Sequence, residues 1–196
     1  MTALWLSSGD PRLSSSRDPE VSRRSLEEAV IDPAQEADRA RVLELLDTHG
    51  AVLADRTTAP GHLTGSALVV DSDGERVLLM LHAKLRRWLQ PGGHADGDAD
   101  VLAVALREGR EESGIAELEA LSPEIFDVDV HEIPARKGEP AHLHYDVRFA
   151  LVAPAGAQLV VSEESHDLAW VPRAEVAHYN TDDSVLRMAA KWDTRT

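Results

Sequence analysis

Three glutamates at spacings of three and four residues constrain this chain more than any other feature. Glu108, Glu111 and Glu112 lie in the segment Arg-Glu-Gly-Arg-Glu-Glu. On a helix these spacings place the side chains on one face, where like charges repel by about 0.2–0.5 kcal/mol per pair. A tight Pro-Gly-Gly turn precedes the helix at residues 91–93. A glycine turn that leads into an acidic helix face suits a hard divalent cation, because such ions prefer oxygen ligands.

Charge and composition exclude several classes of function. The chain has 196 residues, 43% of them hydrophobic, which fits one domain with its own core. A net charge of −15 opposes binding to nucleic acid or to an anionic membrane, so we expect neither partner. The lack of cysteine excludes thiolate metal sites and cysteine nucleophiles. No apolar run approaches the length of a membrane helix and no secretory signal is evident, so we expect a cytoplasmic protein.

The residue pattern predicts a mixed α/β (α+β) domain with an N-terminal helical extension. Residues 1–24, rich in Ser, Arg, Asp and Pro, predict a flexible arm, and residues 25–58 predict the helical extension. In that extension Asp32 is a candidate N-cap, Gln35 is placed for a capping box, and Gly50 ends the helix. The main domain is expected over residues 59–196. Strands are expected at 63–71, 76–82, 124–133, 141–152, 158–162 and 169–171, and helices at 100–113, 173–178 and 182–192.

Histidines and cations near these elements are candidates for substrate contacts. His94 follows the glycine turn directly, while His142 and His144 share one face of an expected strand. The histidine pair can bind phosphate, stack on a base or form a hydrogen-bonded sheet surface, and the sequence leaves these alternatives open. Asp127 and Asp129 also share a strand face, which we expect to be exposed to solvent. The cations that can bind phosphate are Lys84, Arg86, Arg87, Arg136 and Lys137.

The turn and helix together resemble the signature of the Nudix hydrolase family. That signature is Gly, five residues, Glu, seven residues, and then Arg-Glu-U-x-Glu-Glu-x-Gly-U, in which U is a bulky apolar residue. Gly93 lies fourteen residues before Arg107, and the helical part of the signature follows through Ile115. The chain departs at two positions, with Ala99 in place of the isolated glutamate and Gly109 in place of the first apolar residue. The phrases WLQPGGH, HLHYDVRF and WVPRAEV resemble a bacterial Nudix subgroup of unassigned substrate.

The resemblance implies a fold, a reaction and a set of site residues. The fold is an α/β/α sandwich with a mixed sheet over residues 59–196. The reaction is hydrolysis of a nucleoside diphosphate-linked or similar diphosphate by water attack on phosphorus, with Mg²⁺ or Mn²⁺ as cofactor. The implied metal ligands are Gly92, through its carbonyl, and Glu108, Glu111 and Glu112. The implied catalytic residues are the same three glutamates and Arg107, which would orient them and can reach Glu111. The implied substrate-binding residues are His94, Arg87 and His144.

Several alternatives stay open at this level. The departures at Ala99 and Gly109 motivate a second hypothesis, a non-hydrolytic Nudix-like module that binds a nucleotide metabolite. Asp98 or Asp100 can supply the carboxylate that Ala99 lacks. The sequence leaves the identity of the diphosphate, the general base and the role of residues 1–58 undecided. A homodimer is compatible with the sequence, which does not determine the oligomeric state.

Overall fold

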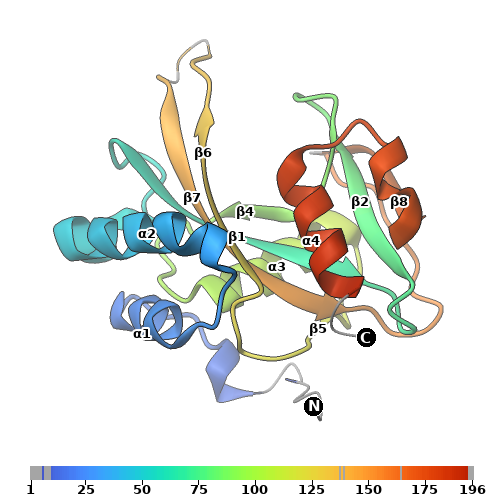
Figure 1. Cartoon of the computed structure of the whole chain (residues 1–196), viewed down its shortest axis with the longest axis horizontal. Coiled ribbons are helices and arrows are strands. Elements are labelled where there is room, and N and C mark those ends of the chain that lie inside the picture. Colours follow the sequence, from blue (N-terminus) through green and yellow to red (C-terminus); the bar gives the residue numbers. More distant parts are fainter. Residues whose placement is uncertain (1–5, 7–9, 137, 139, 164, 194–196) are drawn as a thin grey trace.

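The chain folds into one mixed sheet with helices on both faces (Figure 1). The structure is a computed structural model, which describes residues 6, 10–136, 138, 140–163 and 165–193. The helices in the described ranges are α1 (Glu20–Glu28), α2 (Glu36–His49), α3 (Val101–Ser113) and α4 (Asp183–Asp193), with 3-10 turns η1 (Pro11–Leu13), η2 (Pro33–Gln35), η3 (Gly50–Ala54) and η4 (Arg173–His178). The strands in those ranges are β1 (Gly61–Val70), β2 (Arg76–His82), β3 (Trp88–Leu89), β4 (Gly92–His94), β5 (Glu119–Ala120), β6 (Asp127–Ile133), β7 (His142–Val152) and β8 (Ser165–Pro172).

Two parallel strands, β1 and β7, form the centre of the sheet. They pair along ten residues of register, from Gly61 opposite Leu143 to Val70 opposite Val152. The other edge of β1 has two partners. Residues 64–66 pair with β4, and the last residue, Val70, pairs with β2. β2 continues to β3 and β8, and β7 pairs with β6 and β5 on its far side. The glycine turn therefore runs beside the middle of the central strand.

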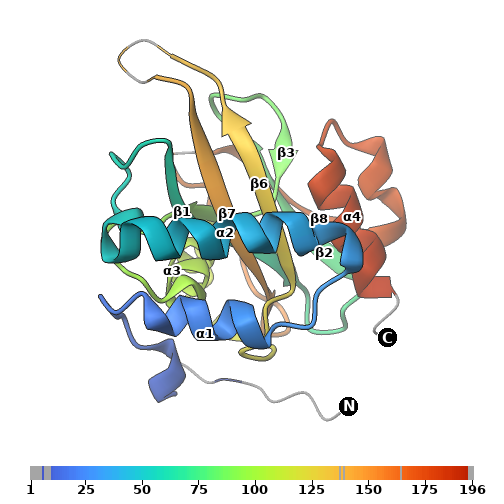
Figure 2. The same cartoon turned by 60° about the vertical axis from the view of Figure 1, so that its left-hand side comes forward.

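One face of β1 and β7 is apolar and packs on three helices. Side chains alternate between the faces of a strand, and Leu63, Ala67 and Phe149 belong to the apolar set. This set joins a core with the buried residues of α1, α2 and α3, and α1 and α2 run side by side along it (Figure 2). A Cβ on Gly65 would lie only 2.7 Å from the carbonyl oxygen of Val101. A glycine here therefore lets α3 approach the sheet closely.

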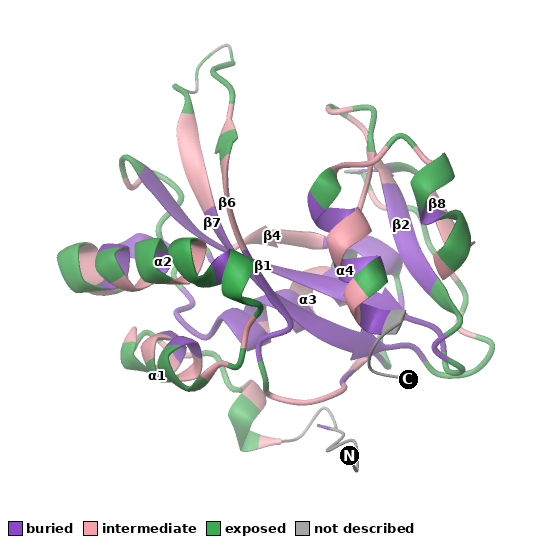
Figure 3. Ribbon diagram, viewed as in Figure 1, coloured by how far each residue is buried: buried purple, intermediate pink, exposed green. Residues whose placement is uncertain are grey.

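The opposite face changes from polar to apolar along its length. Its β1 residues run from His62, Thr64 and Ser66 to Leu68 and Val70. The apolar end forms a second core beneath α4. The indole of Trp192 at the end of α4 donates a 3.0 Å hydrogen bond to the carbonyl of Gly74. Figure 3 shows β1 buried, while the start of β7 and much of β6 are only partly buried. The polar end is the part of this face that borders a cavity.

The N-terminal region docks earlier than its composition predicts. α1 begins at Glu20, so the boundary expected at residue 24 falls inside a packed helix. Leu26 is fully buried, the Ser22 hydroxyl donates to the carbonyl of Ala99, and the Ser16 amide donates to Asp98. The capping box predicted for Gln35 is wrong. Its side-chain amide donates instead to Asp127 and to the carbonyl of Val128, which ties the helical extension to the sheet.

Most other elements lie where the sequence predicts them, with differences at their ends. β2 and η4 match their expected residues, although η4 is a 3-10 helix. β8 is longer than predicted because it pairs with β2 from Ser165 to Pro172. The strand predicted at 158–162 is wrong, because this segment is irregular and leaves Val160 and Val161 exposed. Asp32 caps η2 and Gly50 ends α2 with a positive φ of 55°, as the sequence predicts. No described helix is both long and apolar enough to span a membrane.

Candidate active site

The acidic face of α3 lies against the glycine strand β4. Asp100 caps α3 by accepting from the amides of Leu102 and Ala103. At the other end of the site, the amide of Gly92 donates a 2.7 Å hydrogen bond to Glu112, which is 5% exposed. A Cβ on Gly93 would collide with the carboxylate of Glu108. Gly93 is therefore required by the close approach of Glu108, whereas a Cβ on Gly92 would collide with Ser66 of β1.

The three glutamates differ in exposure. Glu112 is buried and lines a cavity, Glu108 is partly buried, and Glu111 is exposed. The same helix face thus presents one carboxylate inside the cavity wall, one against β4 and one toward solvent. The hydrogen bond from the amide of Gly92 fixes the direction of the Glu112 carboxylate.

Arg107 joins α3 to β4. Its guanidinium donates 2.8 Å hydrogen bonds to Glu108 and to the carbonyl of His94. The sequence spacing predicts a reach to Glu111, but the structure places the guanidinium on Glu108. Arg107 therefore positions the carboxylate that covers Gly93.

The two residues that depart from the signature, Ala99 and Gly109, are both closely packed against other parts of the chain. Ala99 is buried beneath the N-terminal segment, through the contacts of Ser16 and Ser22 with residues 98 and 99. Asp98 accepts from the amides of Ser16 and Asp100, and Asp100 caps α3, so both carboxylates hold backbone groups. At Gly109 an added Cβ would lie 2.9 Å from Leu151. The sheet thus fills the space of the expected apolar side chain, and the helix packs closely.

A cavity of about 240 Å³ opens beside Glu112, on the polar face of the sheet. Five of the cations and histidines predicted to contact substrate line it, namely Lys84, His94, Arg136, His142 and His144. Arg87 does not line it, because its guanidinium donates to the carbonyl of Thr181 at 3.0 Å. Lys137 lies outside the described residues. The cavity therefore lies beside the turn and strands that the sequence indicates, while the guanidinium of Arg87 lies against Thr181.

A buried network of charged side chains lies next to the cavity, and its member Asp146 lines the cavity wall. Arg148 is 1% exposed and its guanidinium contacts Asp146 at 2.7 Å, Asp127 at 3.2 Å and Asp129 at 3.3 Å. Arg187 of α4 also pairs with Asp127 at 2.8 Å. Burial alone would raise the pKa of Asp146, but the charge of Arg148 holds that pKa below its usual range. The prediction of a solvent-exposed face for Asp127 and Asp129 is wrong, because α4 and Arg148 cover it.

Asp146 links this network to the cavity. Its carboxylate accepts from the hydroxyls of Thr64 at 2.9 Å and Ser66 at 2.7 Å, and from the Nε of Arg148 at 2.7 Å. It also lines the cavity. A carboxylate with three donors stays ionised and fixed in direction.

Five histidines cluster where the cavity meets β1 and β4. His62, His94 and His144 contact one another with ring centroids 4.9–5.2 Å apart. His142 joins them at 5.0 Å from His62, and His131 at 5.6 Å from His144. Burial, and then the neighbouring histidines, lower the pKa of His62 to about 4 and that of His144 to about 3. These two rings are therefore neutral at pH 7.

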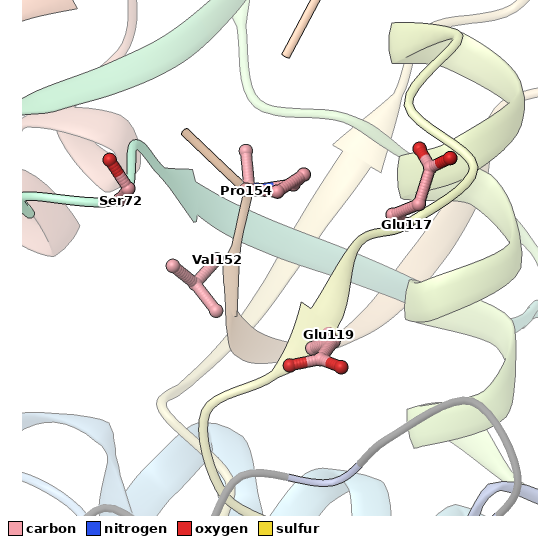
Figure 4. Close-up of a pocket in the computed structure, with 6 residues that line it drawn as sticks. Ser72, Glu117, Glu119, Val152 and Pro154 are labelled. Atoms are coloured by element: carbon pink, nitrogen blue, oxygen red, sulfur yellow. The ribbon is translucent and has the colours of Figure 1, made fainter. Parts of the chain in front are cut away.

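A separate hollow at the other end of the sheet lacks this chemistry. It measures about 280 Å³ and is lined by Ser72 and Glu119 among others (Figure 4). Glu117 and Glu119 come from the segment after α3 and are its charged lining residues. Two carboxylates without a lining cation would repel a phosphate. The cavity beside Glu112 is the better candidate for an anionic substrate.

Comparison with known proteins decides the family. A family model described as the NUDIX domain matches residues 60–190. The chain belongs to the NUDIX domain family. A probable DHNTP pyrophosphohydrolase of Lactococcus lactis is 27% identical over 145 residues, which are 73% of this chain and 80% of that protein. The m7GpppN-mRNA hydrolase NUDT17 of Danio rerio is 28% identical over 123 residues, which are 59% of this chain and 41% of that protein.

Solved structures agree with the fold of this NUDIX protein. The E. coli dihydroneopterin triphosphate pyrophosphohydrolase superposes with a TM-score of 0.53 at 18% identity, over 68% of this chain and 96% of that chain. At this identity the likeness shows the fold alone. The family match and the relatives named as hydrolases indicate a Nudix-type diphosphohydrolase.

Proposed function

We propose that this NUDIX protein is a divalent-metal-dependent hydrolase of a diphosphate, linked to a nucleoside or a similar group. The observation that carries the proposal is the clamp between β4 and α3. There the amide of Gly92 fixes Glu112 at the wall of the cavity, while Gly93 admits Glu108 one helical turn away. This arrangement holds two carboxylates close to one cavity, and the missing side chain of Gly93 leaves room for Glu108.

The residues present fit Mg²⁺ or Mn²⁺. Both ions prefer oxygen ligands, and the clamp offers carboxylates together with the carbonyl of Gly92. Glu108, Glu111 and Glu112 would hold the ion, with Glu111 reaching from the exposed side of the helix. When bound, such an ion neutralises phosphate charge and acidifies a water molecule.

The protein's own side chains would then orient the substrate. Lys84 and Arg136 line the cavity and can bind the phosphate oxygens of a polyanion, which a chain of net charge −15 otherwise repels. Arg107 holds Glu108 in place, and Glu108 is the candidate to take a proton from the attacking water. His94 borders both the clamp and the cavity, and can contact the group beyond the diphosphate.

The substrate is proposed only as a class. The curated relatives are named for two different substrates, DHNTP and a capped mRNA. What supports the class is the pairing of an oxygen-rich cation site with lining cations. The departures at Ala99 and Gly109 do not remove a residue of the clamp, so turnover is favoured over binding without hydrolysis.

Glu112→Gln tests the proposal. Wild-type protein is incubated with a panel of nucleoside diphosphate-linked compounds and Mg²⁺ or Mn²⁺, and phosphate or nucleotide release is measured. We expect turnover that EDTA abolishes, and a fall in kcat of about 100-fold or more in Glu112→Gln because the clamp loses its buried charge. Glu117→Gln, which changes an exposed glutamate just beyond α3, is the matched control and should retain full activity.

Two results would contradict the proposal. One is wild-type turnover that survives both EDTA and Glu112→Gln. The other is tight binding of a panel compound by calorimetry with no turnover under any metal, which would favour the non-hydrolytic binding module.

A further inference from the structure

Three of the clustered histidines have nitrogens that converge on one point. His62 extends from β1, while His142 and His144 extend from the same face of β7, with His62 directly opposite His144 in the parallel register. One ring nitrogen from each of the three lies within 4.8 Å of the others. These rings come from the two central strands, so the sheet itself fixes their spacing.

The nitrogens are buried without a hydrogen-bond partner. Among the described residues, both ring nitrogens of His62 and the Nε2 of His144 have no hydrogen-bond partner. Water cannot easily supply one to His62, because that residue is only 2% exposed. Leaving a buried polar atom unsatisfied costs about 1–3 kcal/mol. Such a cost on two neighbouring rings points to a ligand that the lone pairs would bind.

The third ring has its hydrogen already assigned. The Nδ1 of His142 lies 3.0 Å from the carbonyl oxygen of Pro140, which can only accept. Nδ1 therefore carries the hydrogen, and Nε2 carries the lone pair. A histidine that donates one N–H to a backbone carbonyl while its other nitrogen is left for a ligand has the arrangement typical of a metal-binding ring.

We propose that His62, His142 and His144 form a second cation site, which binds Zn²⁺ or a similar transition ion such as Co²⁺. The donor chemistry separates this site from the clamp on α3. Neutral imidazoles suit transition ions, whereas the carboxylates of Glu108 and Glu112 suit Mg²⁺ and Mn²⁺. The three nitrogens face one another closely enough for each to offer a lone pair to one cation, which accounts for the unpartnered nitrogens of His62 and His144.

The surroundings have the shape and charge for such an ion. A hollow of about 360 Å³ is lined by His62 and His142, so an open ligand position can hold water. Arg56 borders this hollow, but its guanidinium is paired with Asp96 through two hydrogen bonds, which offsets its charge. A tetrahedral ion with bonds of roughly 2.0–2.1 Å would draw the three nitrogens to roughly 3.4 Å apart, a shift of about 1 Å that side-chain rotation can supply.

Cobalt titration in excess Mg²⁺ tests the proposal. The full chain is stripped with EDTA, desalted and placed in millimolar Mg²⁺, which occupies the carboxylates. Co²⁺ is then added and its visible absorption is followed, with Zn²⁺ as a competitor that removes the signal. We expect one Co²⁺ per chain, and affinity at least about 10- to 100-fold weaker in His142→Ala and in His62→Ala.

Three further variants make the outcome decisive. His166→Ala and His178→Ala remove exposed histidines outside the cluster, and both should bind Co²⁺ as the wild type does. Glu112→Gln should also bind Co²⁺ normally, which separates this proposal from the proposed hydrolase activity. His142 is only partly buried, so His142→Ala should stay folded by circular dichroism even if His62→Ala does not. Equal Co²⁺ affinity in the wild type and His142→Ala, or displacement of Co²⁺ by Mg²⁺, would overturn the second site.

Discussion

Two buried polar clusters lie side by side on one sheet face, and they treat their hydrogen-bonding groups in opposite ways. In the charge network around Arg148, three aspartates surround one guanidinium, and Asp146 has two further hydroxyl donors. In the histidine cluster, His62 and His144 keep nitrogens without a described partner. The contrast teaches that the first cluster is complete without a ligand, while the second is suited to receive one.

The position of each cluster agrees with that difference. The network lies deeper along the strands, where Arg187 of α4 reaches down to Asp127. The histidines lie at the open end of the same strands, between two cavities. We expect substitutions in the network to change stability, and substitutions among the histidines to change binding.

Arg148→Met should have the largest effect on folding. It leaves Asp127 and Asp146 buried without their common cation, so the free energy of unfolding should fall by about 3–5 kcal/mol. Urea denaturation measures the change. Arg41→Met, which removes an exposed partner of Asp38, is the matched control and should cost under about 1 kcal/mol. If the two variants lose the same stability, the network does not have the structural role assigned to it.

Asp71→Asn should lower the free energy of unfolding less than Arg148→Met does, because the pair of Asp71 and Arg76 lies away from the cavity and is partly exposed. Burial raises the pKa of Asp71, but hydrogen bonds from Arg76 and two backbone amides outweigh it and leave that pKa below its usual value. The stabilisation is therefore present above about pH 4 and is lost as the pH falls through the folded-state pKa. Asp71→Asn should cost about 1 kcal/mol at pH 7 and almost nothing near pH 2, as measured by denaturation at both pH values. A cost independent of pH would contradict the ionised pair.

His62→Leu should have the smallest effect on folding, provided that metal is absent. The ring makes no described hydrogen bond, so an apolar side chain of similar size should change the free energy of unfolding by under about 1 kcal/mol in EDTA. Thermal unfolding is the measurement, with Arg148→Met as the contrasting variant. A loss of 3 kcal/mol or more in EDTA would show that the histidines are as structural as the charge network, and the comparison would fail.

Local residue chemistry predicted the clamp well. The Pro-Gly-Gly turn, Asp100 before α3 and Gly114 after it are signals within a few residues, and the structure places them accordingly. Glu112 and Gly92 contact each other through the turn that the sequence predicted. The roles of these residues in catalysis and metal binding stay predictions.

Contacts between distant strands were harder to predict. The sequence does not indicate His62 as a site residue, because its neighbours in the cluster lie on other strands and only the fold brings them together. A signal existed in the alternation of polar residues His62, Thr64 and Ser66 along β1, which matches the polar alternation along β7. The sequence predicts an exposed Asp127 because its partner Arg148 is 21 residues away in sequence. Arg87 is a candidate phosphate ligand in the sequence, but the direction of its side chain depends on packing beside Thr181.

The docking of the N-terminal segment bears on where this protein can be cut. Ser16 and Ser22 hold the loop at residues 98 and 99, immediately before α3, and Leu26 belongs to the core that α3 shares. A fragment limited to residues 60–190, as the family match would suggest, loses those contacts and exposes the apolar side of the sheet. The packed structure therefore begins well before residue 60, where the family match begins. Removing the N-terminal segment would release the loop at residues 98 and 99 that leads into α3.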